Sequence, residues 1–282
     1  MYATHGCESN VKEIYDKCHE LEAESDEYLI LNQFDQFGNA VWHYEVTGYT
    51  IENLFNQIKI GNQKLSAYIS ATGSAGTLAA GDYLREKFPS LKVLASEAQQ
   101  CPTLLLNGFG GHRIEGIGDK HVPWIHNVKN TDVVAAIDDE QTLRILRLFN
   151  EPEGHKWLTR LGVKKEAINK LPYLGISSIC NLLSAIKLAK YFEYNEDDII
   201  FTVFTDSVEL YNSRLTELND QWGKYSATQA EVDWTSIFKH QGVDYFKELS
   251  YYDKKSIHNL KYFTWVEQQG KSVEELYAQW YD

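Results

Sequence analysis

The most regular pattern along the chain is an alternation of apolar and polar side chains over residues 65–71, LSAYISA. This two-residue period predicts a β-strand. The small residues GSAGT follow at 73–77, and apolar and charged positions then recur over 77–88 with the period of an amphipathic helix. The stretch therefore predicts a strand, a tight loop and a helix in direct succession.

Other apolar runs predict further strands. Residues 91–95 and 132–137 form compact runs, and residues 28–34, YLILNQF, are expected to form a short strand near the N-terminus. Residues 199–204, IIFTVF, are nearly all apolar, which is typical of a strand buried on both faces of a parallel sheet.

Helical periodicity fills the intervals between these strands. We expect helices over 9–24, within 38–58, over 140–149 and in the second half of 174–190. Strands that alternate with helices predict an α/β fold with a mainly parallel sheet and helices on both faces.

The character of the chain changes after Trp222, where aromatic residues crowd a polar background. The sequence SVEE at 272–275 is a capping box and predicts a last helix. We therefore expect a helical C-terminal extension that packs on the sheet or on a second subunit. The expected parts are residues 1–58, 59–215 and 216–282.

Three polar turns, at 72–77, 175–178 and 205–207, are expected at the carboxyl ends of the strands. Open α/β sheets bind their ligands at the carboxyl ends of strands. The turn GSAGT is suited to a phosphate group, because small residues let backbone N–H groups approach an anion and the following helix adds a partial positive charge. The turn lacks the lysine of a Walker loop and does not match GxGxxG. On its own, the motif is as compatible with a turn that binds no ligand as with a phosphate site.

Composition narrows the class of protein. A net charge of -13 argues against nucleic acid or an anionic membrane as the partner. Four cysteines lie far apart, without the spacing of a zinc site, and are expected to be reduced thiols. Neither a membrane-spanning run nor a signal-peptide pattern is found. We expect an acidic, soluble, cytoplasmic protein without a metal.

Four segments in order resemble those of cysteine synthases. GSAGT resembles their GTGGT, HRIEGIGDKHVP resembles HKIQGIG followed by a proline, and GISSICN resembles GISSGAA. The segments NQF at 32–34 and HYEVTG at 43–48 resemble a further stretch, NQFxNPxN…HYETTG. Together they cover about residues 5–215 and identify a resemblance to fold-type-II pyridoxal-phosphate enzymes, the tryptophan-synthase-β-like fold.

The resemblance implies pyridoxal 5′-phosphate as the cofactor and an amino acid as the substrate. Ser177, with Ser178 as the alternative, matches the hydroxyl that faces the pyridine nitrogen, although a helix N-cap is the structural alternative for Ser177. Gly116 and Ile117 match the turn at the mouth of the site. The residues that match the loop around the cofactor phosphate are Gly73, Ser74, Ala75, Gly76 and Thr77.

The family's Schiff-base lysine lies in an early Ser-x-Lys segment, which precedes a Ser/Thr-Gly-Asn loop that grips the substrate carboxylate. Neither segment is expected in these residues, so the chain resembles the C-terminal two thirds of such an enzyme. Lys120, in the loop GIGDKHVP, is the one lysine near the implied site, and the resemblance gives it no role. We therefore expect no catalytic residue in this chain and no activity of the chain alone.

The resemblance favours a lyase or synthase that works by β-elimination or β-replacement. A homodimer is expected, and a second subunit is the alternative. Two other functions stay open: the β subunit of a two-component enzyme such as 2-amino-4-ketopentanoate thiolase, and a non-catalytic copy that binds a phosphate ligand or a protein.

Overall fold

The computed structural model describes residues 2, 3 and 11–282, so Cys7 and the first residues of the predicted helix 9–24 lie outside the described part. Its centre is a five-stranded sheet of order β4-β1-β2-β3-β5. The first four strands are parallel, and β5 runs antiparallel to β3. The strands are β1 (Lys64–Ala71), β2 (Lys92–Ala98), β3 (Val133–Ile137), β4 (Asp198–Thr202) and β5 (Phe246–Glu248). The predicted α/β fold with a mainly parallel sheet is confirmed.

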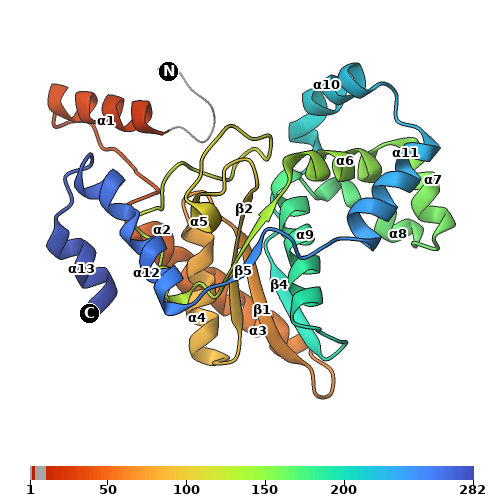
Figure 1. Ribbon diagram of the computed structural model, residues 1–282, viewed down its shortest axis with the longest axis horizontal. Coiled ribbons are helices and arrows are strands. Elements are labelled where there is room, and N and C mark those ends of the chain that lie inside the picture. The colour runs from red at the N-terminus through yellow and green to blue at the C-terminus, as the bar shows by residue number, and fades with distance from the viewer. Residues whose placement is uncertain (1, 4–10) are drawn as a thin grey trace.

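Helices precede the sheet, connect its strands and follow it (Figure 1). Those of the first half are α1 (Lys12–Glu24), α2 (Phe37–Trp42), the π-helical η1 (His43–Gly48), α3 (Tyr49–Ile58), the 3₁₀ turn η2 (Gly76–Leu78), α4 (Ala79–Lys87), α5 (Thr103–Leu106), η3 (Val128–Asn130) and α6 (Asp139–Asn150). Those of the second half are α7 (Pro152–Arg160), α8 (Lys165–Ile168), η4 (Leu171–Tyr173), α9 (Ile176–Tyr191), η5 (Val208–Tyr211), α10 (Asn212–Trp222), α11 (Ala227–Asp233), η6 (Trp234–Lys239), α12 (Tyr251–Asn259), η7 (Tyr262–Val266) and α13 (Val273–Tyr281).

Both faces of β1 are buried. Tyr68 belongs to a hydrophobic cluster with Leu84 of α4, whereas Ile69 belongs to a separate cluster with Leu188 of α9. The serines of the alternating pattern are buried as well, because their hydroxyls find partners inside the fold. Ser66 Oγ donates to Asp198 Oδ1 at 2.6 Å, and Ser70 Oγ bonds Thr77 Oγ1 at 2.5 Å. Here the alternation marks a strand between two layers of helices.

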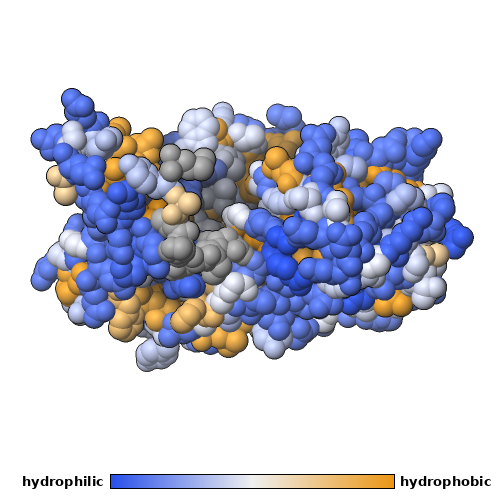
Figure 2. All heavy atoms as spheres, turned by 90° about the horizontal axis from the view of Figure 1, so that it is seen from above, coloured by the Kyte–Doolittle hydropathy of each residue, from blue (hydrophilic) through white to orange (hydrophobic). Residues whose placement is uncertain are grey.

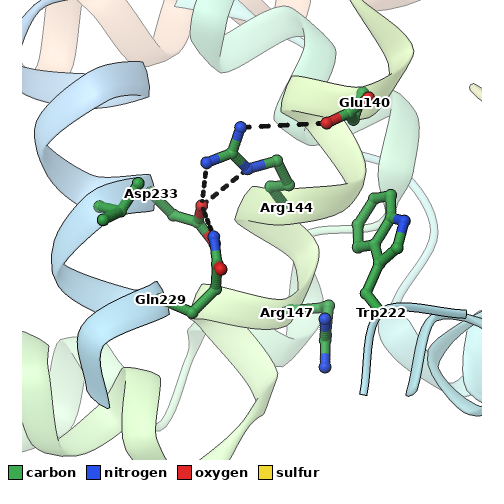
Figure 3. Close-up of a pocket in the computed structure, with 7 residues that line it drawn as sticks. Glu140, Arg144, Arg147, Trp222, Gln229 and Asp233 are labelled. Carbon is green, nitrogen blue, oxygen red and sulfur yellow. Dashed lines mark hydrogen bonds and ion pairs between the residues drawn. The ribbon is translucent and has the colours of Figure 1, made fainter. Parts of the chain in front are cut away.

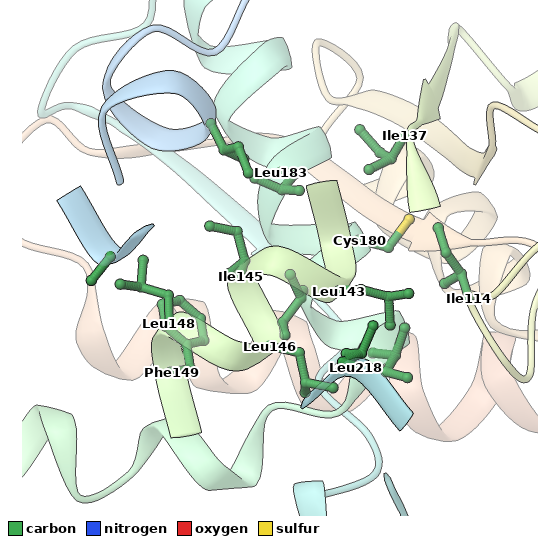
Figure 4. Close-up of a cluster of buried hydrophobic side chains, with 14 of the residues drawn as sticks. Ile114, Ile137, Leu143, Ile145, Leu146, Leu148, Phe149, Cys180, Leu183 and Leu218 are labelled. Atoms are coloured by element: carbon green, nitrogen blue, oxygen red, sulfur yellow. The ribbon is translucent and has the colours of Figure 1, made fainter. Parts of the chain in front are cut away.

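The largest hydrophobic cluster lies where α6 and α9 pack against the carboxyl side of the sheet (Figure 4). Leu143 and Leu146 of α6 meet Cys180 and Leu183 of α9, and all four are fully buried. The cluster extends to Leu218 of α10. Burying apolar area at about 25 cal/mol per Å² makes this contact a main source of stability. It fixes α9, which begins at Ile176, so three of the four residues expected to form the turn 175–178 are helical.

Two strand predictions need correction. Residues 28–34 do not form a strand, and Leu29 and Leu31 are 80% and 77% exposed. In the structure this segment pairs with neither edge of the sheet. Strand β4 does form, but it is an edge strand with every residue half-buried, so the expectation of burial on both faces is wrong. An apolar run reports that a segment is hydrophobic and leaves open which neighbours cover it.

The C-terminal region is mostly helical, as predicted, and also adds β5 to the sheet. The capping box of α13 is present, since Ser272 Oγ accepts from Glu275 N and the Glu275 carboxylate accepts from Ser272 N. No single helix among the described residues could span a bilayer; the sharply bent pair 165–173 and 176–191 fits the length and composition of a span. The second member of that pair is α9, with ten buried residues in the core of the fold.

Lys261 anchors this region. Its ammonium group, 1% exposed, donates to Trp124 O and His126 O at 2.8 Å and to Gln279 Oε1 at 2.7 Å. One side chain thus joins the end of α12, the loop after Pro123 and α13. All three acceptors are uncharged, so the lysine works through hydrogen bonds.

We predict that Lys261→Met lowers the free energy of unfolding by about 3 kcal/mol, because three buried oxygens lose their donor. Chemical denaturation followed by circular dichroism measures the loss. The control is Lys271→Met, which removes the partly exposed pair with Asp35 Oδ2 at 3.3 Å and should cost less than about 1 kcal/mol. Equal losses in the two variants would contradict the anchoring role of Lys261.

Candidate functional site

The loop from 72 to 77 leaves the carboxyl end of β1 and enters η2. Ala75 adopts a left-handed conformation with φ 66°, and a Cβ at Gly76 would overlap the side chain of Asn39. That side chain donates to Ser74 Oγ at 3.1 Å, which fixes the loop from the outside. Across the described chain, no acceptor is found for four N–H groups of this loop, those of Gly73, Ser74, Ala75 and Thr77. These amides are available to an anion.

A second glycine turn lies against the first. Gly118 N donates to Thr72 O at 2.7 Å, and a Cβ on Gly73 would lie 3.4 Å from Gly116 O and 3.7 Å from Ile117 Cα. Gly116 and Gly118 both have positive φ, of 83° and 77°, which residues with a Cβ adopt at a cost. The structure therefore brings the predicted turn of Gly116 and Ile117 next to the predicted phosphate loop.

The two serines at the start of α9 differ in their partners. Ser178 Oγ donates to Thr205 O at 2.6 Å and accepts from Thr205 N at 3.1 Å, which ties α9 to the segment after β4. Ser177 is 6% exposed, and its hydroxyl has no hydrogen-bond partner among the described residues. The N-cap position belongs to Gly175 and not to Ser177. Of the two predicted hydroxyls, the one on Ser177 is available to a ligand.

The three predicted polar turns share one edge of the sheet. Strands β1 and β4 are hydrogen-bonded neighbours and run parallel, so their carboxyl ends lie side by side. Ile117 and Ile176 belong to the same hydrophobic cluster, and Ala71 at the end of β1 packs against it. The cluster thus joins the loop 72–77, the turn at 116–118 and the start of α9 into one site.

Two buried carboxyl groups near this edge were missed by the sequence analysis. Burial raises the pKa of Asp119 to about 7, and its side chain has no hydrogen-bond partner within the described residues. Burial also raises the pKa of Glu97, at the end of β2, to about 8, although Leu104 N and Leu105 N both donate to it at 2.9 Å. The position of Asp119 directly after the 116–118 turn was the available signal, but no sequence pattern announces that a carboxyl group is buried.

The lysines that the sequence draws attention to lie outside the site. Lys120 is exposed, with Nζ 5.4 Å from the centre of the Phe109 ring. One Ser-x-Lys triplet does occur, at 90–92, contrary to the expectation from the sequence. Lys92 is the first residue of β2, at the amino end of the parallel strands, and its Nζ pairs with Glu248 at 2.9 Å. The triplet therefore resembles the family motif in sequence but not in position.

A cavity of about 360 Å³ lies apart from this edge, between α6, α11 and the end of α10 (Figure 3). Arg144 points toward Asp233, and its Nη2 lies 2.6 Å from Asp233 Oδ1, while Arg147 lies beside Trp222. Asp233 is fully buried and also accepts from Tyr225 Oη at 2.9 Å. These contacts hold α11 to α6, so we assign the cavity to packing.

Within the described residues, no group of three or more His, Cys, Asp or Glu side chains could hold a metal ion. The face shown in Figure 2 is largely polar, with apolar side chains in separate patches. The site is thus made of backbone amides, hydroxyls and buried carboxyl groups.

Comparison with known proteins finds relatives among the cysteine synthases. Cysteine synthase B of Campylobacter jejuni is 27% identical over 205 residues, which cover 72% of this chain and 59% of the relative. Cystathionine β-synthase of Saccharomyces cerevisiae is 25% identical over 211 residues, covering 72% of this chain and 38% of the relative. The homologues of this chain are pyridoxal-phosphate-dependent enzymes of the cysteine synthase type.

The solved structures show the same fold. The crystal structure of O-acetylserine sulfhydrylase isoform 3 from Entamoeba histolytica matches with a TM-score of 0.61 and 24% identity, over 80% of this chain and 59% of that one. No protein-family model matches the chain. The chain spans about half the length of the curated relatives it matches, with 59% and 53% of two cysteine synthases covered.

The two serines give a prediction about stability. Ser178→Ala should lower the free energy of unfolding by about 2 kcal/mol, because a buried backbone donor and acceptor at Thr205 lose their partner. Ser177→Ala should change it by less than about 0.5 kcal/mol, since that hydroxyl has no partner to lose. Urea denaturation of both variants measures the difference. A larger loss for Ser177→Ala would mean that its hydroxyl is structural.

Proposed function

We propose that this chain forms the cofactor-phosphate and ring-binding part of a pyridoxal-phosphate-dependent lyase or synthase that acts on an amino acid. The observation that carries the proposal is the convergence of the free amides of 73–77 and the free hydroxyl of Ser177 at one edge of the sheet. Homology to cysteine synthases supports β-elimination or β-replacement as the reaction type.

The residues present fit the phosphate and the ring nitrogen of this cofactor. Unpartnered amides at the start of η2 are suited to a dianion, and Ala75 already holds the left-handed conformation that opens the loop. In this assignment the phosphate is bound by Gly73, Ser74, Ala75, Gly76 and Thr77. Ser177 bonds the ring nitrogen, whereas Ser178 is occupied by Thr205. Gly116 and Ile117 border the substrate side.

When bound, the cofactor supplies an electron sink for the bonds at the amino-acid α-carbon. A neutral hydroxyl does not hold a proton on the ring nitrogen as a carboxylate would, so Ser177 keeps that sink weaker than an acidic residue would. This tuning suits β-elimination and β-replacement better than transamination.

We further propose that the lysine required for catalysis comes from another polypeptide segment, so that these residues alone do not turn over substrate. The positions of Lys92, which pairs with Glu248 where β2 begins, and of Lys120, which is exposed beside the Phe109 ring, support this. The same observation fits both one longer chain that carries the lysine and a β subunit that works with a second protein. We propose a homodimer in the cytoplasm, where the free thiols of Cys18, Cys101 and Cys180 are stable.

Calorimetric titration tests the phosphate site in the chain as it stands. Pyridoxal 5′-phosphate should bind, and pyridoxal, which lacks the phosphate, should bind at least about tenfold more weakly. Ser74→Asp should remove most of the difference, because it adds a negative charge to the loop. The control Asn195→Asp adds the same charge in the turn before β4, at the amino end of the parallel strands, and should leave binding unchanged. Equal affinities for the two ligands would overturn the assignment.

Activity assays test the second part of the proposal. The purified chain should release no measurable pyruvate or cysteine from O-acetylserine and sulfide in the presence of the cofactor, because in this proposal the catalytic lysine belongs to another segment. A separate control is a complete cysteine synthase under the same conditions. Measurable turnover by the purified chain would show that one of its own lysines serves.

A further inference from the structure

One buried carboxyl group next to the phosphate loop has no role in the proposed function so far. Asp119 is 9% exposed, and its Oδ2 would lie 3.9 Å from a Cβ placed on Gly73. The backbone holds it there: Thr103 Oγ1 donates to Asp119 O at 2.7 Å, and Gly118 N donates to Thr72 O. The carboxyl group therefore lies beside the first residue of the loop, and among the described residues no cation or hydrogen-bond donor pairs with it.

Among the described residues, the ionisable groups near Asp119 come from its own loop, from α1 and the segment before α2, and from Glu97 of β2, which α5 covers. Burial lowers the pKa of His121 to about 4, so its ring is neutral at physiological pH. Burial, reinforced by the charge of Asp119, raises the pKa of Tyr15 in α1, whose Oη bonds His121 Nε2 at 3.2 Å. Asp35 acts on Tyr15 in the same sense. The ring of His112 lies against Gly118, and the loop 73–77 carries no ionisable side chain.

An anion in the loop and a negative charge on Asp119 oppose each other. Like charges within about 4–6 Å disfavour each other's ionised forms, and the loop offers amides but no lysine or arginine to offset a second negative charge. Burial strengthens this repulsion, because little water screens it. Proton binding at Asp119 removes the repulsion and turns the carboxyl group into a hydrogen-bond donor.

We propose that the loop 73–77 takes up its anion together with a proton on Asp119, so that this residue sets the protonation state in which the site is filled. The inference rests on the proposed function, because it concerns the same phosphate site. A neutral Asp119 beside the bound anion is also a proton source at the mouth of the site.

The sign of the pH dependence follows from the raised pKa of Asp119, about 7 in the free protein. Below that pH the carboxyl group already carries its proton, and anion binding takes up none. Above it, binding must add a proton, so affinity falls by up to about tenfold per pH unit.

Sulfate is the appropriate probe, because it carries the same charge from pH 5 to 9 and so contributes no titration of its own. Calorimetry at pH 6 and pH 8.5, each in two buffers of different ionisation enthalpy, yields both affinity and proton uptake. For the wild-type chain we expect sulfate to bind at least about tenfold more weakly at pH 8.5 than at pH 6. At pH 8.5, binding should take up close to one proton per sulfate.

The decisive variant is Asp119→Asn, which keeps the size of the side chain and removes its charge. It should bind sulfate equally well at both pH values, with no proton uptake at either. Because it removes a buried charge, it is expected to fold. Two controls should keep the wild-type pH dependence. His112→Gln removes the histidine ring that lies against Gly118. Glu196→Gln removes a negative charge just before β4, at the amino end of the parallel strands.

The outcomes separate this inference from the proposed function. Sulfate binding with the same proton uptake in Asp119→Asn as in the wild type would overturn the role of Asp119 and leave the phosphate site intact. Loss of the pH dependence in His112→Gln would transfer the role to the histidine and overturn the inference as well. Failure of both sulfate and pyridoxal 5′-phosphate to bind at any pH would refute the phosphate site itself.

Discussion

Parallel pairing of β1 with β2 and β4 is the constraint on which the rest of the structure depends. Parallel strands end at the same edge, so three loops far apart in the sequence meet there. Both faces of β1 are covered by helices, which fixes the strand in register and leaves the loop after it little freedom. Backbone amides can serve as ligands only where the backbone is held in this way. The site follows from the sheet.

The sequence predicted those elements whose structure depends mainly on adjacent residues. The strand β1, the loop after it and the presence of α9 were all predicted, because alternation, small residues and helical period are properties of adjacent residues. The start of α9 was predicted too late, since the helix begins at Ile176. Burial of β4 and the strand expected at 28–34 were predicted wrongly, since both depend on neighbours that the segment itself does not encode. The three-residue strand β5 is too short to give any periodic signal.

The candidate site shows the same division. Its small residues and hydroxyls could be found from motifs, whereas the difference between Ser177 and Ser178 could not, because it depends on where Thr205 lies. The burial of Asp119 depends likewise on α1, α5 and the loop before it folding over one carboxyl group. The Ser-x-Lys triplet at 90–92 matches the family motif in sequence but not in position. Lys92 is the first residue of β2, at the end of the strand away from the candidate site.

The three hydrogen bonds of Lys261 have a consequence for the order of folding. Its acceptors belong to segments 137 and 18 residues away in the sequence, and Gln279 comes last. During synthesis the ammonium group cannot be fully bonded until α13 has left the ribosome. The bonds to Trp124 O and His126 O, in a loop a few residues beyond the 116–119 turn, do not need α13, whereas the bond to Gln279 forms only when α13 docks. Docking of α13 thus completes, late in folding, the hydrogen bonds of the lysine that holds a loop continuous with the site.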